Sequence, residues 1–212
     1  MRELMPGLFI SFEGGEGSGK TTQLKALLAH LRSACRDVIE TRDPGGTPIG
    51  KQIRGLLLDR QNAGMAPAAE LLLYEASRAQ VIHEVIRPAL SQGRIVLCDR
   101  FTDSTVAYQG VLLSEIMGKE NAFSFLDEMW EFFLRPDATI LFVSDPVKAI
   151  HRVGTRGPRT SYERMEFLAL VQEAFVAMEA KEPDRFVRVY ADVPLETLIK
   201  EVETKVKHAL TK

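Results

Sequence analysis

One segment near the start of the chain combines glycines, a lysine and a threonine at the spacing of a phosphate-binding loop. Residues 14–21, GGEGSGKT, match the pattern GxxxxGK[ST] and stand between an apolar run and a helical pattern. The glycines let the backbone turn its N–H groups inward, and the N-terminus of the following helix adds partial positive charge. We predict that this loop binds a nucleoside triphosphate through Gly14, Gly15, Glu16, Gly17, Ser18, Gly19, Lys20 and Thr21.

Two residues of this loop have a more specific chemistry. Lys20 can reach the outer phosphates, and the Thr21 hydroxyl can ligate Mg²⁺. The apolar run RIVLC ends in a second suggestive pair, Asp99-Arg100. We predict that Asp99 joins Thr21 near the metal and that Arg100 is a catalytic cation pointing at a phosphate. An enzyme that holds two phosphorylated molecules needs such an additional cation.

The phosphate loop alone is compatible with kinases, GTPase switches and motor ATPases. The sequence contains no NKxD motif of the kind that a GTPase uses to read its base. A motor or transporter ATPase would have a longer chain and usually an acidic pair after a second strand. The pair Asp99-Arg100 therefore favours a transferase.

Short apolar runs alternate with longer helical patterns and must position these residues. We expect strands at 8–13, 38–41, 94–99, 138–144 and 185–191, and helices at 19–35, 47–59, 67–91, 102–110, 120–132, 145–153, 160–181 and 195–210. This alternation predicts an α/β fold, a doubly wound five-stranded parallel sheet with helices on both faces. Ligands of such sheets bind beyond the carboxyl ends of the strands.

The pattern at 67–91 also predicts which side of that helix is buried. Its apolar residues Leu72, Ala76, Ala79, Ile82 and Ile86 recur at steps of three or four, which predicts that this face packs on the core. Pro88 is expected to bend or end the helix. No linker rich in proline, glycine or serine divides the chain, so we expect one domain over 1–212.

The composition limits the possible partners and compartments. A net charge of −2 and a pI of about 6.1 give no general attraction to nucleic acid or to anionic membrane, so we expect neither as a partner. The sequence has no signal-peptide pattern and no apolar run that could span a bilayer. Cys35 and Cys98 fit no metal spacing and are expected to be free thiols in a cytoplasmic protein.

Three further motifs follow in order: TRDPGGTPIGKQIR at 41–54, LLLYEASRAQ at 71–80 and DRFTDSTVAYQG at 99–110. With the phosphate loop, they make the chain resemble the bacterial thymidylate kinases, which are nucleoside monophosphate kinases with a P-loop. The resemblance is strong over 8–110 and looser beyond. It implies transfer of the γ-phosphoryl group of ATP to dTMP, with Mg²⁺ as the metal, in dTTP biosynthesis.

The resemblance also assigns an acceptor site. It implies that Glu16 faces the 3′-hydroxyl of the acceptor sugar, that Asp43 belongs to the same wall, and that Arg54 and Arg100 contact the acceptor phosphate. Tyr74 would stack on the pyrimidine and Arg78 would donate to a base carbonyl, while Thr105 and Gln109 line the thymine edge. Glu75 stands where the family usually has an apolar or aromatic residue.

The segment HRVGTRGPRTSYERME at 151–166 carries four arginines among glycines and a proline. We expect a small lid there, whose arginines clamp the transferring phosphoryl group and exclude water. Because the phosphate loop contains no arginine, the resemblance implies that the lid supplies the catalytic one, and we favour Arg156 and Arg159. The resemblance further suggests a homodimer through the long helices, which the apolar Val81 and Val85 would allow.

Two alternatives remain open from the sequence. The acceptor could be another nucleoside monophosphate, such as dUMP, UMP or a purine nucleotide. Alternatively, the chain could be a P-loop ATPase switch that binds a partner protein and hydrolyses its nucleotide without an acceptor.

Overall fold

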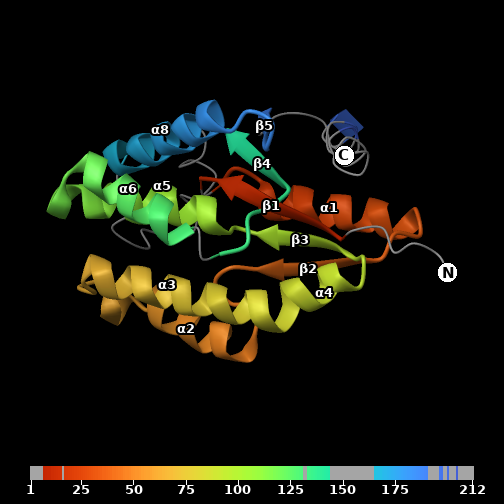
Figure 1. Cartoon of the computed structure of the whole chain (residues 1–212), viewed down its shortest axis with the longest axis horizontal. Coiled ribbons are helices and arrows are strands. Elements are labelled where there is room, and N and C mark those ends of the chain that lie inside the picture. The colour runs from red at the N-terminus through yellow and green to blue at the C-terminus, as the bar shows by residue number, and fades with distance from the viewer. Residues whose placement is uncertain are drawn as a thin grey trace.

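The computed structural model describes residues 7–15, 17–130, 133–143 and 165–190, with residues 196, 197, 200 and 204. Five parallel strands form one sheet in the order β2-β3-β1-β4-β5 (Figure 1). They are β1 (Leu8–Gly14), β2 (Val38–Arg42), β3 (Ile95–Asp99), β4 (Ala138–Val143) and β5 (Phe186–Tyr190). All five predicted strands are confirmed, and so is the doubly wound sheet, whose order reverses beside β1.

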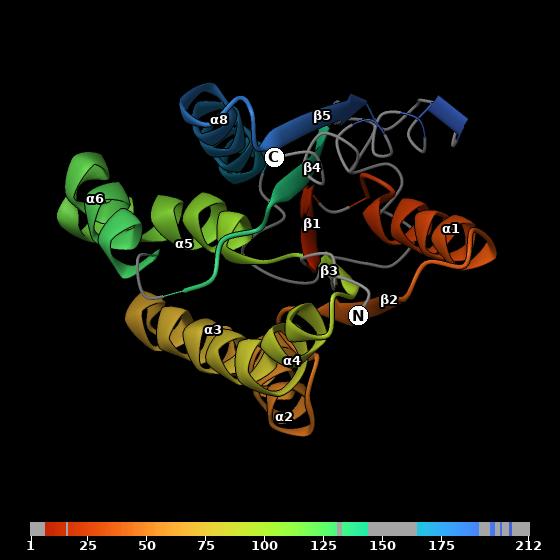
Figure 2. The same cartoon turned by 45° about the vertical axis from the view of Figure 1, so that its right-hand side comes forward.

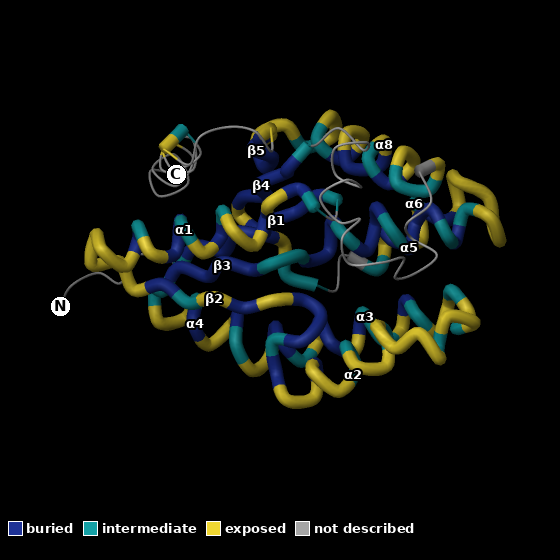
Figure 3. Tube along the Cα trace, turned by 180° about the vertical axis from the view of Figure 1, so that it is seen from behind, coloured by how far each residue is buried: buried dark blue, intermediate teal, exposed yellow. Residues whose placement is uncertain are grey.

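Helices cover both faces of this sheet, as predicted. On one face, the helix α1 (Lys20–Ser33) packs Leu24, Leu27 and Leu31 against β1, β3 and β4. The other face is covered by the helices after β2, β3 and β4, and Figure 2 shows α5, α6 and α8 across the sheet from α1. In Figure 3 the buried residues follow the strands and the helix sides that face them.

The helices after β2 form an almost continuous run. They are α2 (Pro48–Leu58), the 3₁₀ turn η1 (Arg60–Asn62), α3 (Pro67–Val81), the π-helical turn η2 (Ile82–Ile86) and α4 (Arg87–Ser91). The helix expected at 67–91 is therefore present, and it changes to π geometry in the turn before Pro88. Proline cannot donate the i→i−4 hydrogen bond, so a wider turn before it is a common accommodation.

The predicted buried face is wrong within α3 and right beyond it, since Ile82 and Ile86 of η2 are buried. Leu72 is 66% exposed, and Ala76 and Ala79 are exposed as well. The buried side of the helix contains Leu71 together with the charged residues Glu75 and Arg78. The apolar pattern misled because this helix turns a polar side inward, where hydrogen bonds and ion pairs satisfy it.

The expectation that Val81 lies at a subunit contact is also wrong. Its exposed fraction is 1%, and it belongs to the core cluster that joins the end of α3 to Phe9, Val96 and Phe101. Val85, the second residue of that expectation, is half-buried against the same cluster.

The remaining helices are α5 (Thr102–Met117), α6 (Lys119–Trp130) and α8 (Met165–Lys181). α5 continues seven residues beyond the predicted end at 110 and stops at Gly118, whose φ of 83° ends helical geometry. No helix among the described residues is long and apolar enough to cross a membrane. The helix expected at 145–153, nearly all of the predicted lid and most of the expected helix at 195–210 lie outside those residues.

Candidate active site

The phosphate loop begins where β1 ends, at the carboxyl edge of the sheet. Gly14 has a φ of 130°, and a Cβ atom there would lie 2.3 Å from the carbonyl oxygen of Phe142 in β4. Gly17 and Gly19 also have positive φ values, of 72° and 82°. These left-handed conformations suit glycine and explain why the sequence places it at each position. Glu16 lies outside the described residues.

Lys20, the first residue of α1, folds its side chain back across the loop. Its ammonium group donates to the carbonyl oxygens of Gly14 at 2.9 Å and Gly15 at 2.7 Å. It also lies 3.3 Å from the hydroxyl of Ser18, which itself donates to Gly15 O at 2.8 Å. The loop thus holds a buried cation at the N-terminus of a helix, where anions are favoured.

The two predicted metal ligands lie together. The Thr21 hydroxyl donates to Asp99 Oδ2 at 3.0 Å, because Thr21 is in the first turn of α1 and Asp99 ends β3 beside β1. A hydroxyl and a carboxylate are hard oxygen donors that suit Mg²⁺, which commonly takes one or two carboxylates and completes its shell with phosphates and water. Arg42, at the end of β2, lies 3.5 Å from the same carboxylate oxygen.

Arg100 has an unusual backbone and a well-defined side chain. Its φ is 68°, which is rare for a residue other than glycine, and its N–H donates to Phe12 O at 3.0 Å. The guanidinium donates to the Ser104 hydroxyl at 2.9 Å and lies 5.1 Å from the centre of the Tyr108 ring. The fold therefore holds this cation beside the phosphate loop from both its backbone and its side chain.

Arg54 belongs to the same positive region. Its guanidinium donates to the carbonyl oxygen of Pro44 at 3.1 Å. Burial lowers the pKa of Arg54, and the nearby cations Arg42 and Arg100 lower it further. Arginines gathered at the carboxyl edge of a sheet are suited to bind a phosphate dianion.

Arg78 lies at the centre of a buried ionic cluster. With 1% of its surface exposed, it donates from Nε to Asp43 Oδ2 at 2.8 Å, from Nη1 to Glu75 and from Nη2 to Thr105 Oγ1 at 2.6 Å. Burial raises the pKa values of both carboxyls, and the charge of Arg78 opposes that rise. Glu75, which had no explanation from the sequence, is thus a partner of the predicted base-binding arginine.

Tyr74 and Gln109 are the other two residues predicted to contact the acceptor base. Gln109 is buried and donates from Nε2 to Glu70 Oε1 at 2.9 Å. Burial raises the pKa of the Tyr74 phenol to about 12; Glu70 and Asp43 also raise it, while Arg100 and Arg54 lower it. Tyr74 therefore stands among the other predicted acceptor residues, and it is half-buried, so part of its surface is accessible to a ligand.

Sequence reasoning missed several members of this site. Arg42 ends the second strand, Glu70 holds Gln109, and Ser104 and Tyr108 hold Arg100. Glu13 is the most unexpected, because it is a fully buried carboxyl inside β1. Burial raises the pKa of Glu13 to about 8, Asp103 adds to this rise, and Ser104, Arg100 and the Phe101 N–H oppose it. The available signal was a charged residue at the end of an apolar strand.

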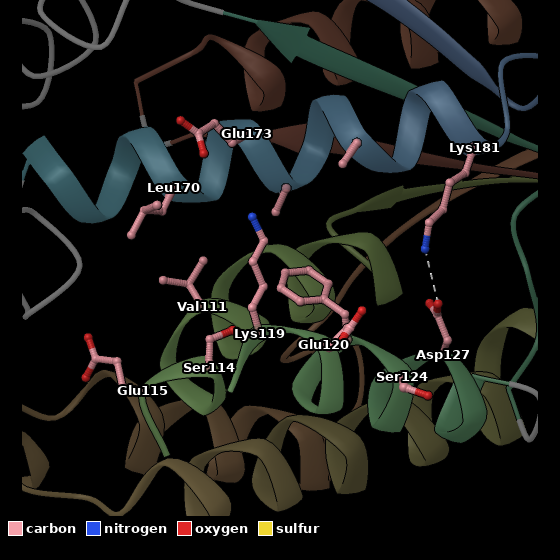
Figure 4. A pocket seen from close by; sticks show the side chains of 13 residues that line it. Val111, Ser114, Glu115, Lys119, Glu120, Ser124, Asp127, Leu170, Glu173 and Lys181 are labelled. Carbon is pink, nitrogen blue, oxygen red and sulfur yellow. Dashed lines mark hydrogen bonds and ion pairs between the residues drawn. The ribbon is translucent and has the colours of Figure 1, made fainter. Parts of the chain in front are cut away.

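A separate cavity of about 880 Å³ lies between α5, α6 and α8 (Figure 4). Val111, Phe123 and Leu170 give it apolar walls, and the ion pair of Lys181 with Asp127, at 3.4 Å, bridges the two outer helices. None of the predicted site residues lines it. The predicted lid arginines Arg156 and Arg159 lie outside the described residues.

Taken together, the fold and site define a class. A phosphate loop holds one cation, and the arginines Arg42, Arg54 and Arg100 lie close to one another and to Tyr74 at the same edge of the sheet. This arrangement provides for a nucleoside triphosphate and a nucleoside monophosphate, which is the arrangement of a P-loop nucleoside monophosphate kinase.

Comparison with known proteins identifies the family within this class. Residues 12–202 match the family model described as "Thymidylate kinase". The thymidylate kinase of Exiguobacterium sp. (strain ATCC BAA-1283 / AT1b) is 42% identical over 200 residues, which cover 93% of each chain. That of Pseudomonas fluorescens (strain Pf0-1) is 42% identical over 208 residues, covering 97% of this chain and 98% of the relative. The chain belongs to the thymidylate kinase family.

A solved structure agrees with this assignment. The crystal structure of thymidylate kinase from Ehrlichia chaffeensis superposes with a TM-score of 0.73 at 32% sequence identity. The match covers 95% of this chain and 99% of that one, so the likeness extends over the whole fold.

Proposed function

We propose that this enzyme transfers the γ-phosphoryl group of ATP to dTMP, giving ADP and dTDP, a step in dTTP biosynthesis. The observation that carries the proposal is the second set of residues beside the phosphate loop. Arg78 and Tyr74 belong to α3, Gln109 is bonded to Glu70 of the same helix, and Arg54 and Arg100 lie near Tyr74, which supports their proposed role as the acceptor site. Membership of the thymidylate kinase family points to thymine as the base.

Phosphoryl transfer depends on positioning and charge stabilisation, with little covalent chemistry from the protein. In the proposed mechanism the loop N–H groups and Lys20 hold the triphosphate. Arg100 and Arg54 neutralise the acceptor phosphate and orient it toward the γ-phosphorus. Thr21 and Asp99 would hold Mg²⁺, which supplies additional charge stabilisation when bound. The acceptor phosphate is itself an adequate nucleophile, so no general base is proposed.

Several parts of the proposal rest on residues outside the described ranges. We assign Glu16 to the sugar 3′-hydroxyl, since a carboxylate can accept that hydrogen bond. We assign Arg156 and Arg159, in the lid at 151–166 of a single domain, to the transferring phosphoryl group. A cytoplasmic location is part of the same proposal, and the free thiols Cys35 and Cys98 are compatible with it.

A coupled assay of ADP formation with dTMP, dUMP, UMP, GMP or no acceptor tests the activity. We expect turnover to be fastest with dTMP and negligible without an acceptor. A higher kcat/KM for dUMP or UMP would transfer the proposal to another monophosphate kinase, which the family assignment does not favour. ADP formation at the same rate without any acceptor would replace the kinase by an ATPase.

We also propose a homodimer formed through α2 and α3. Its support is the exposed apolar side of α3, with Leu72 66% exposed, beside α2, where Ile49, Leu56 and Leu58 are each about half exposed. Apolar surface of this kind gains by burial against a second copy.

Mass measurement by light scattering tests this assembly. We expect a dimer for the wild type and a monomer for Leu72→Glu, because a buried charge would disrupt the interface. Leu170→Glu, at an exposed leucine of α8, is the matched control and should remain dimeric. A monomeric wild type, or a Leu72→Glu variant that stays dimeric, would remove α3 from the interface.

A further inference from the structure

Glu13 is a buried carboxyl that has no role in the mechanism above. It is the last side chain of β1 before the phosphate loop, which begins with Gly14, and its exposed fraction is 0%. Glu13 Oε1 accepts the N–H of Phe101 at 2.7 Å, and Oε2 is hydrogen-bonded to the Ser104 hydroxyl. One carboxyl thus joins the strand that carries the loop to the first turn of α5.

Both of these contacts flank Arg100. Phe101 follows it in the chain, and Ser104 accepts a hydrogen bond from its guanidinium at 2.9 Å. Glu13 therefore fixes the backbone just after Arg100 and, through Ser104, the end of its side chain. The Arg100 φ of 68° costs about 1–2 kcal/mol for an L-residue, so the surrounding contacts must hold it in place.

The contacts of Glu13 also begin α5 in an unusual way. Phe101 is the residue that precedes the helix, and it provides no side-chain cap of its own. In a common capping arrangement, a carboxylate of the helix's own first turn accepts the N–H of this residue. Here the carboxylate comes from a strand 88 positions earlier in the sequence. The start of α5, which also carries Thr105, is thereby tied to the strand that leads into the phosphate loop.

Stability alone does not account for a carboxyl at this place. Taking an ionised carboxyl out of water costs several kcal/mol, which is why burial raises the pKa of Glu13, and apolar replacements of buried ionisable groups are often neutral or stabilising. The cost is larger here because Asp103 lies nearby, itself fully buried and held by Arg185 at 2.7 Å and Thr139 at 2.8 Å. Buried polar groups that a fold could replace by apolar ones are candidates for a functional role.

We propose that Glu13 is a positioning residue that couples the phosphate loop to Arg100, keeping the acceptor-side cation in register with the bound triphosphate. It acts through the Phe101 N–H and the Ser104 hydroxyl and touches neither substrate. The inference rests on the proposed function, in which Arg100 contacts the acceptor phosphate. A displacement of about 1 Å at such a cation can cost about 100-fold in rate.

The test compares Glu13→Gln and Ser104→Ala with the wild type in full steady-state kinetics. We expect kcat/KM for dTMP to fall about 10- to 100-fold in each variant, with KM for ATP changing less than about threefold. Each substitution is then repeated in an Arg100→Ala background. The further loss there should be less than about threefold, because residues that act through one group are not additive. Ser104→Ala leaves the contact between Glu13 and Phe101 in place, so it carries the test if Glu13→Gln folds poorly.

Asp137→Asn is the matched control. Asp137 accepts the N–H of Phe9 at 2.7 Å, so it is also a carboxylate bonded to a backbone N–H, but of a residue near the opposite end of β1. We expect it to lower the melting temperature while leaving kcat/KM for dTMP unchanged. Equal fold-losses in the wild-type and Arg100→Ala backgrounds would show a merely structural role and overturn the proposal. A wild type that does not phosphorylate dTMP would instead refute the function itself.

Discussion

Lys20→Ala is expected to reduce kcat for dTMP phosphorylation by about a thousandfold, the size of effect seen when a preorganised charge-stabilising donor is lost. Lys20 is 6% exposed, and its ammonium group lies 2.9 Å from Gly14 O and 2.7 Å from Gly15 O. It is therefore fixed before the substrate arrives and need not reorganise as negative charge develops on the phosphoryl oxygens. Alanine leaves the N–H groups of the loop but removes this charge.

Single-turnover measurements at saturating ATP and dTMP give the rate of the chemical step. Lys25→Ala, at an exposed lysine on the same helix, is the control and should keep its wild-type rate. The melting temperature of Lys20→Ala is measured alongside, because the substitution also leaves the carbonyl oxygens of Gly14, which is buried, and of Gly15 without the ammonium. If this variant retained more than about a tenth of the wild-type rate, Lys20 would not be the principal cation of the donor site.

The sheet and most helices could be predicted because local sequence and tertiary structure agree. The β-branched and aromatic runs of β1, β3 and β4 are apolar on both sides, as central parallel strands require, and all three are buried. The unusual backbone conformation of the phosphate-loop glycines could be predicted, because a loop that turns its N–H groups toward a phosphate needs positive φ values. Thr21 and Asp99 could be paired because β3 runs parallel to β1.

The polar interior could not be predicted in the same way. Leu72 and Ala76 looked like a core stripe, yet they are exposed because α3 turns Glu75 and Arg78 toward Asp43. Hydrophobic periodicity assumes that the inward side is the apolar one, and it fails where a buried charge finds partners from another element. These partners come from β2–α2 and α5, far away in the sequence.

The same limit applies to Glu13. Its residue type was visible at the end of an apolar strand, but its two contacts lie 88 and 91 positions away. Only the parallel pairing of β1 with β3 brings the start of α5 to this carboxyl. The apolar residues thus determine the arrangement of strands and helices, and the functional polar residues are placed on it. Contacts between those polar residues join distant parts of the sequence, so sequence patterns predict them least well.

Arg78→Met is expected to damage both folding and acceptor binding, and the two effects can be separated. The substitution leaves the buried carboxyls Asp43 and Glu75 without their shared cation, and breaking such a pair costs about 3–5 kcal/mol of unfolding free energy. We also expect KM for dTMP to rise about 10- to 100-fold, the value of one hydrogen bond to a charged group, with KM for ATP nearly unchanged. Equal changes in both KM values would remove Arg78 from the base site.

The pH dependence of stability distinguishes the ionic cluster from simple loss of packing. Burial raises the pKa values of Asp43 and Glu75, and Arg78 is the charge that opposes this rise most; without it, hydrogen bonds from Ser77 and Thr105 and the charge of Arg54 oppose the rise less. An acid with a raised pKa in the folded state binds its proton more tightly there than in the unfolded chain. The contribution of these two groups to the free energy of unfolding is then fully present at low pH, and it is lost as pH increases through the raised pKa. The deficit of Arg78→Met relative to the wild type should therefore grow as pH rises from about 4, the ordinary pKa of these carboxyls, toward neutrality.

Urea unfolding of both proteins across this range measures that deficit directly. Arg188→Met is the matched control, because Arg188 pairs with Glu179 at the surface and should contribute about 1 kcal/mol or less, with little change across this pH range. A deficit of Arg78→Met that stayed constant with pH would mean that lost packing, and not the two unpaired carboxyls, destabilises the variant. A deficit that grows with pH, together with a selective rise in KM for dTMP, would show that the Arg78 guanidinium both pairs with the buried carboxyls and binds the acceptor.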